Sequence, residues 1–152
     1  MKSLFFTIAS IVALSATAQE LALDKVDEFT GSTLKLTKNY LVGKYSASKL
    51  FIGFRRVDSS YGVSLWSTGD QGCAGAVGNY VIFLDANGNT IKLDDDISDV
   101  DCADMSTSVY VIDPAEFESF IPTKVRFAQS EGYLDYPFEC EFTIQQLLTA
   151  IK

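Results

Sequence analysis

Short segments in which apolar and polar side chains alternate recur along the chain after residue 30. Alternation with a period of two residues is typical of strands that bury one face and expose the other. Clusters of Gly, Asn, Asp and Ser separate these segments and indicate turns. The predicted strands cover residues 34–37, 49–57, 61–65, 80–84, 90–93, 108–112, 124–127 and 138–142.

Two of the predicted turns join neighbouring strands into hairpins. Asp58-Ser59-Ser60 lies between two predicted strands. The apolar face of the first strand consists of Leu50, Ile52 and Phe54, and that of the second consists of Tyr61, Val63 and Leu65. The second turn, residues 85–89, contains Asn-Gly between two β-rich runs. Asn-Gly is a strong hairpin signal because both residues tolerate a positive φ.

Two short helices complete the pattern. Asp113-Pro114 places a capping residue before a proline at the first helical position, and this helix should end near Ile121. Thr143 to Gln146 has the spacing of a capping box, and the apolar side chains that follow should pack on the sheet. About seven or eight strands with two short helices, one of them C-terminal, predict a mainly β fold. We expect a β-sandwich or a partly open barrel.

The first residues differ from the rest of the chain. Lys2 is followed by an apolar run over residues 4–14 and by Ala16-Thr17-Ala18. These features are typical of a cleavable secretory signal, and the run is too short to span a bilayer as a helix. We therefore expect residues 1–18 to be a signal peptide and 19–152 a single domain. The mature domain is expected in the periplasm, at the cell surface or outside the cell.

Charge narrows the classes of partner. The chain has 20 acidic and 12 basic residues and a net charge of −8, and its largest basic cluster is Arg55-Arg56. Such a field repels phosphate backbones, so nucleic-acid binding is not expected. No apolar segment after the signal peptide is long enough to span a membrane as a helix, so we expect no membrane span in the mature domain.

The sequence contains no histidine. This removes the commonest general base and the nucleophile pairs that depend on it. A catalytic site would have to rest on carboxylates, tyrosines or cysteines. We therefore expect that the domain is not an enzyme and binds no cofactor. A small hydrolase that uses carboxylates is the less favoured alternative.

Three cysteines are an odd number for an exported chain. Cys73 and Cys102 lie in expected loops, whereas Cys140 lies between Phe138 and Phe142 in an alternating segment. Loop thiols of exported proteins are commonly paired, while a cysteine on an apolar face behaves as a small buried hydrophobe. We predict a disulfide between Cys73 and Cys102 and a free, buried Cys140, and three free thiols remain the alternative.

Residues 94–104 hold six aspartates, the densest charge run of the chain. Carboxylate oxygens are ligands that Ca²⁺ prefers, and residues 85–96 place several oxygens at EF-hand spacing. However, Gly88 stands at position four of that loop, where an EF-hand requires glycine at position six. The hairpin explains these residues better, so no metal site is predicted, although Ca²⁺ binding by Asp94–Asp104 stays undecided.

A candidate binding surface follows from the face opposite the predicted core. If Leu50 and Ile52 point inward, Phe51, Arg55 and Trp66 point outward. Exposed aromatic side chains beside an arginine are typical of protein or sugar contacts. The interpretation that we favour from the sequence is that the C-terminal helix covers this face and makes Trp66 a second core residue, because large apolar residues are usually buried. Both interpretations are open at the level of sequence.

The chain resembles a loose group of small exported proteins of unknown function, common in Bacteroidota. The resemblance rests on Ala18-Gln19, residues 25–30 (KVDEFT), residues 84–93 with their Asn-Gly turn, and residues 124–127 (KVRF). It implies a compact β-rich domain in the periplasm or at the cell surface, and no activity. The expected function is a non-enzymatic binding or structural accessory domain of the cell envelope that contacts another envelope protein. The alternative is a carbohydrate-binding module that uses exposed aromatic side chains.

Overall fold

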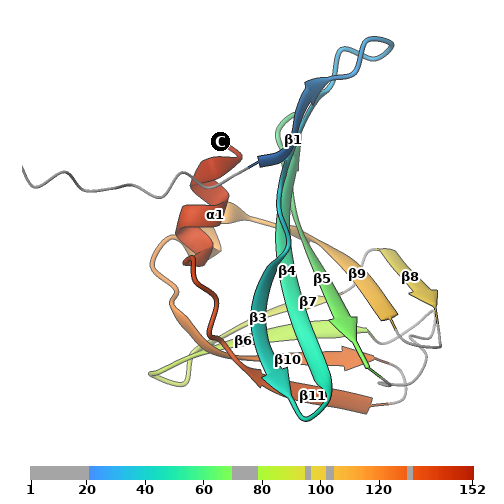
Figure 1. Ribbon diagram of the computed structural model, residues 1–152. Helices are drawn as coiled ribbons and strands as arrows, with labels where there is room; N and C mark the ends of the chain where they lie inside the picture. Colours follow the sequence, from blue (N-terminus) through green and yellow to red (C-terminus); the bar gives the residue numbers. More distant parts are fainter. Residues whose placement is uncertain (1–20, 70–78, 95–96, 102–104, 130–131) are drawn as a thin grey trace, which may run out of the picture.

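The computed structural model describes residues 21–69, 79–94, 97–101, 105–129 and 132–152. These residues form two antiparallel sheets, with one α-helix at the C-terminal end (Figure 1). The mainly β, sandwich-like fold predicted from the sequence is therefore confirmed. No closed barrel is formed by the strands of the described part. The predicted signal peptide, residues 1–18, lies outside the described residues.

The larger sheet contains seven strands in the order β1-β2-β4-β5-β9-β8, and β3 also pairs with β4. Its bounds are β1 Leu21–Val26, β2 Thr33–Thr37, β3 Tyr40–Tyr45, β4 Ser48–Val57, β5 Ser60–Thr68, β8 Ile97–Asp101 and β9 Met105–Ile112.

The smaller sheet contains four strands in the order β11-β10-β6-β7. Its bounds are β6 Tyr80–Asp85, β7 Thr90–Asp94, β10 Pro122–Gln129 and β11 Gly132–Pro137. A 3₁₀ turn, η1 (Pro114–Phe117), precedes β10, and the helix α1 (Ile144–Ala150) follows β11.

Both predicted hairpins are present. Ser59 follows Asp58 in a two-residue turn between β4 and β5, and Asp58 has a positive φ of 52°. In the turn between β6 and β7, the Asp85 carboxylate accepts hydrogen bonds from the amides of Asn87 and Asn89, both at 2.8 Å. Gly88 has the positive φ expected there, 86°.

Both predicted helix starts are also present. Asp113 caps η1 by accepting a hydrogen bond from the Ala115 amide, but this element is a single 3₁₀ turn rather than a helix reaching Ile121. Thr143 and Gln146 form the reciprocal capping box of α1. The capping residues alone thus located both starts, whereas the end of the first helix was predicted too late.

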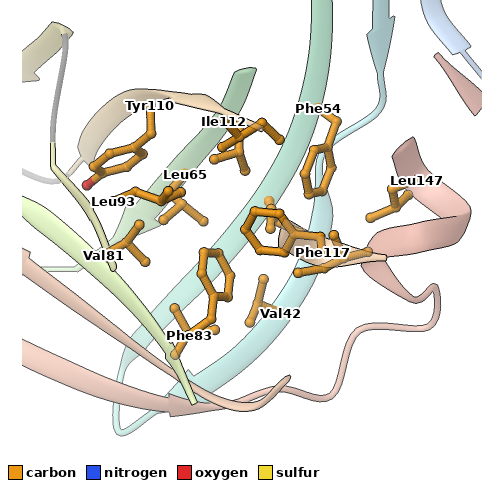
Figure 2. Packing of buried hydrophobic residues seen from close by; sticks show 14 of the residues in the cluster. Val42, Phe54, Leu65, Val81, Phe83, Leu93, Tyr110, Ile112, Phe117 and Leu147 are labelled. Atoms are coloured by element: carbon orange, nitrogen blue, oxygen red, sulfur yellow. The ribbon is translucent and has the colours of Figure 1, made fainter. Parts of the chain in front are cut away.

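The core lies between the inner faces of the two sheets. Alternate residues of β4 and β5, such as Leu50, Ile52 and Leu65, are fully buried against Val81 and Phe83 of the smaller sheet. Figure 2 shows Phe117 of η1 beside Phe83, and their rings meet edge to face at a centroid distance of 5.6 Å. The side chains of α1 that join this core are Ile144, Leu147 and Leu148, followed by Ile151.

The segment 138–142 corrects the sequence prediction, because it is not a strand. Its first two amides bond to different sheets: Phe138 donates to the Thr123 carbonyl and Glu139 to the Val42 carbonyl. The segment is therefore a connector that leaves the smaller sheet and crosses to the edge of the larger one. Its alternating pattern reports an extended backbone with one buried side, and the actual strand is β11, just before it.

Candidate binding surface

The outer face of the larger sheet contains all three residues that the sequence proposed for binding. β4 points Phe51, Gly53 and Arg55 to this face, because Leu50, Ile52 and Phe54 point into the core. Across the β4–β5 pairing, Phe51 is directly opposite Trp66 and Gly53 is opposite Ser64. The predicted division of β4 and β5 into an inner and an outer face is therefore confirmed.

Phe51 and Trp66 form a stacked pair on this face. Their ring centroids are 4.8 Å apart, with an angle of 37° between the planes. Both side chains are partly buried and partly exposed, so part of the pair is accessible from solvent. An indole so placed offers both a ring face and an N–H donor to a ligand.

Arg55 lies on the same face but not beside Trp66. It is four residues beyond Phe51, which corresponds to about 13 Å along a strand. Its side chain lies over Gly62, where an added Cβ would be 2.9 Å from the Arg55 Nε atom. The structure thus brings Phe51 and Trp66 together and leaves Arg55 at the far side of the glycine-lined part of the face.

The helix α1 packs on the inner side of β4, so the interpretation favoured from the sequence, in which this helix covers Trp66, is wrong. The buried side chains of α1 belong to the same cluster as Leu50, Ile52 and Phe54, on the inner side of β4. Because successive residues of a strand point to opposite faces, a helix packed on the even-numbered side chains cannot also cover Phe51.

A hollow of about 260 Å³ lies beside the aromatic pair. It is lined by Asn39, Ser64, Trp66 and Thr107, which come from three segments of the larger sheet: the β2–β3 connection, β5 and β9. Apart from the indole, the described side chains of the lining are one amide and two hydroxyl groups, all uncharged. The Ser64 hydroxyl donates to the Gly53 carbonyl oxygen at 3.3 Å and can still accept a hydrogen bond, and amide and hydroxyl groups in general can both donate and accept.

An interruption of the sheet places Asn39 in this hollow. β2 and β3 both pair with β4 along the same side, with Lys38 and Asn39 between them. At the break, the Thr37 hydroxyl accepts the hydrogen bond of the buried Phe54 amide at 2.8 Å. Asn39 lies directly over Gly53, where an added Cβ would be 2.4 Å from the Asn39 Oδ1 atom.

Asn39, Thr107 and the role of Gly53 were not predicted from the sequence. A glycine within an otherwise apolar strand was the available signal, since such a residue often marks close approach by another segment. No signal in the sequence places Thr107 beside Trp66, because that pairing depends on which distant strand adds to β5.

Of the three cysteines, only Cys140 lies within the described residues. Cys73 and Cys102 lie outside the described residues, so their predicted disulfide stays a prediction. Cys140 is a free thiol, and it is partly rather than fully buried against the core. Burial raises the pKa of the Cys140 thiol.

The acidic run falls largely outside the described side chains, and its relation to Ca²⁺ stays open. Within the described residues, no group of three or more acidic or cysteine side chains is arranged to hold a metal ion. The Asp85 carboxylate is engaged by its own turn, and the Asn89 side chain is the main cause that lowers its pKa. The turn thus uses the oxygen that the EF-hand spacing had suggested as a ligand.

Two further hollows differ from the first in containing charge. One lies on the outer face of the smaller sheet and includes Lys124, Arg126 and Asp135, and the other lies between η1 and α1 and includes Glu118. Among the residues that the structure describes, neither hollow is lined by two carboxylates. No helix in the described part of the chain is long and apolar enough to cross a membrane.

Comparison with known proteins adds no assignment to this geometry. The chain matches no protein-family model, and neither the curated proteins nor the solved structures contain a significant match to it.

Proposed function

We propose that this chain is an exported, non-catalytic binding domain of the cell envelope whose ligand is a neutral glycan. One observation carries the proposal: a stacked, partly exposed Phe51–Trp66 pair borders a hollow lined by uncharged polar groups. The pair can pack on the apolar face of a sugar ring, and the hydroxyl and amide groups can bond its hydroxyl groups. Recognition sites commonly combine an aromatic wall with a few polar groups in this way.

The uncharged lining favours a neutral sugar over an acidic one. Arg55 is the cation on this face named by the sequence, and it lies across Gly62, away from the hollow. A uronic acid or phosphorylated sugar would find no cation among Asn39, Ser64 and Thr107 with which to form an ion pair. We therefore expect neutral hexose-based oligosaccharides to bind and their acidic counterparts to bind more weakly.

A glycan array probed with the purified exported domain tests this proposal. Neutral oligosaccharides that bind on the array are then measured by titration calorimetry. Trp66→Ala removes the main stacking surface and should weaken binding at least tenfold, which corresponds to about 1.4 kcal/mol. Gly53→Ala should also weaken binding, because its methyl group displaces Asn39.

Tyr133→Ala is the matched control, since Tyr133 is an aromatic residue with 57% exposure on the other sheet. It should leave glycan affinity unchanged, and thermal melting should show that all variants are folded. Equal affinities for Trp66→Ala and Tyr133→Ala, or an array without any neutral binder, would contradict the proposal.

Protein contact is the second candidate function for the same face. Val57 and Val111 are exposed on its rim, and Leu41 is exposed beside Phe51 across the β3–β4 pairing. Apolar side chains around an aromatic centre are typical of contact surfaces between proteins. If binding to an envelope protein depends on Val111 as strongly as on Trp66, this candidate replaces the glycan.

A further inference from the structure

The turn between β1 and β2 presents a phenylalanine to solvent. Phe29 has an exposed fraction of 99%, whereas the core phenylalanines Phe54, Phe83 and Phe127 have 1% or less. Val26, at the base of the same turn, is 59% exposed. Figure 1 shows this hairpin projecting beyond the rest of the molecule, away from the smaller sheet.

Hydrogen bonds hold this turn in one conformation. The Asp27 carboxylate accepts the amides of Phe29 and Thr30, each at 2.9 Å. The Asp27 amide donates to the Ser32 carbonyl and the Gly31 amide to the Asp27 carbonyl, both at 2.8 Å. Gly31 supplies the positive φ of 74° that this path requires. The Phe29 ring is therefore displayed by an ordered turn, which lowers the entropic cost of inserting it into a partner.

A hollow on the outer face of the smaller sheet has the complementary character. It measures about 230 Å³ and contains the partly exposed side chains of Ile82 and Leu84. Cavities of about 150 Å³ can hold a benzene molecule, so a phenyl ring is within its capacity. Its polar lining consists of Thr90, Lys124, Arg126 and Asp135.

The charges of the turn and of the hollow are opposite. Asp27 and Glu28 flank Phe29, and the turn contains no cation between Asp27 and Ser32. In the hollow, Asp135 is paired with Arg126 through hydrogen bonds of 2.7 and 2.8 Å. Lys124 is thereby the excess positive charge of the lining. It is exposed and is opposite Leu84 in the β6–β10 pairing, at the edge of the apolar floor.

Phe29 cannot reach this hollow within one molecule. The β1–β2 turn lies at one end of the structure and the four-stranded sheet at the other (Figure 1). We propose that copies of this chain associate head to tail, with Phe29 of one copy inserted between Ile82 and Leu84 of the next. Asp27 and Glu28 then face Lys124 of that neighbour. Two different surfaces meet in such a contact, so each copy keeps one free turn and one free hollow and can extend the chain.

The contact has to overcome a general repulsion, because each copy has a net charge of −8. The local attraction at Lys124 and the burial of one aromatic ring favour the contact, and the area involved is small. We therefore expect weak association with a dissociation constant in the range of about 10 μM to 1 mM.

Sedimentation of the purified exported chain over a range of concentrations tests this inference. The wild-type chain should show an average mass that increases with concentration above that of one copy. Phe29→Ala and Ile82→Glu should each weaken the association at least tenfold. Tyr45→Ala is the matched control, because Tyr45 is an aromatic residue with 53% exposure outside both surfaces, and it should associate like the wild type.

Mixing the two variants distinguishes head-to-tail contact from a symmetric dimer. Phe29→Ala keeps an intact hollow and Ile82→Glu keeps an intact turn, so together they should form a one-to-one dimer and nothing larger. A wild-type chain that stays monomeric up to about 1 mM, or a mixture in which no dimer forms, would overturn the inference.

Charge variants provide a second route in case Ile82→Glu does not fold. Glu28→Lys and Lys124→Glu change exposed side chains only, and each should weaken association. If both leave the sedimentation profile unchanged, the proposed orientation is wrong. The hollow could instead bind an acidic peptide from another protein. In that case the wild-type chain stays monomeric, and Ile82→Glu abolishes binding of the peptide. Neither set of variants touches Trp66, so glycan binding is tested independently.

Discussion

The outer faces of the two sheets differ in how their polar groups are satisfied. On the smaller sheet, charged side chains pair with their neighbours: Arg126 bonds Asp135 of the adjacent strand and stacks at 4.1 Å over Tyr133, and Lys92 pairs with Asp94 of its own strand at 2.6 Å. On the larger sheet, the break between β2 and β3 opens a hollow whose lining includes Asn39 and Thr107.

The difference between the two faces indicates which parts of a small β domain are suited to binding a ligand. A regular ladder brings side chains close enough to pair, so Arg126, Asp135, Lys92 and Asp94 are engaged with one another and Lys124 is left over. An interrupted strand widens the spacing and leaves amide and hydroxyl groups directed at open space. Irregular pairing is therefore the better indicator of a recognition site in this fold than the density of charge.

The substitution expected to reduce stability most lies where β3 contacts the end of β11, between the two sheets. Gly43 of β3 lies against the chain at Pro137, where an added Cβ would be 2.2 Å from the Pro137 carbonyl oxygen. Gly43→Ala should therefore lower the free energy of unfolding by about 3 kcal/mol. Glycan binding and self-association should be lost together if one core supports both faces.

Gly132→Ala is the matched control, because a Cβ at Gly132 would have no atom within 4 Å. Chemical denaturation followed by tryptophan fluorescence measures both variants. Equal stability of the two would show that the backbone at Pro137 moves freely, and the two faces would then not share a rigid junction.

A smaller effect is expected at the break itself. Thr37→Val removes the hydroxyl that accepts the Phe54 amide and leaves that buried donor without its partner. We expect a loss of about 1–3 kcal/mol in the free energy of unfolding. Thr90→Val, at an exposed position of the regular sheet, should change stability by less than about 0.5 kcal/mol. If Thr37→Val is as stable as Thr90→Val, the hydrogen bond at the break between β2 and β3 does not stabilise the fold, and the prediction is wrong.

The smallest effect is expected at the ion pair of the regular face. The hydrogen bonds from Arg126 are the first cause that lowers the pKa of Asp135 below its usual value of 3.8. A lowered folded-state pKa means that the carboxylate stabilises the fold above the usual value, and that this contribution is lost as pH falls through the folded-state pKa. The pair is half exposed, so Asp135→Asn should lower Tm at pH 7 by no more than a few degrees.

Thermal melting of Asp135→Asn and wild type between pH 2 and 7 checks this prediction. The difference in Tm should be largest at neutral pH and should shrink as pH falls below about 4. A difference that does not depend on pH would mean that Asp135 stabilises the sheet through packing rather than through its charge.

The elements with local signals were predictable from the sequence. Asn87-Gly88 located a hairpin, and Thr143 with Gln146 located a helix, because backbone conformation and capping depend on residues close in sequence. Alternation likewise predicted which side chains of β4 point outward. The same period of two residues is sufficient to assign Phe51 and Trp66 to one face of the sheet.

What could not be predicted depends on pairing between distant segments. Strands such as β1, β3, β8 and β11 lacked a decisive pattern and form part of the ladders through their neighbours. The segment 138–142 had the pattern of a strand but crosses between sheets, since alternation reports burial of one side and not a ladder partner. Asn39 and Thr107 entered the site through such pairings, beyond the reach of local sequence.

The pairing of β5 with β9 also has a kinetic consequence. Trp66 and Thr107 are directly opposite each other, although about 40 residues of chain separate them. Non-local pairing requires closure of a long loop before any contact forms, and β-rich topologies of this kind fold in milliseconds to seconds rather than microseconds. The proposed binding surface therefore forms only after this long loop has closed.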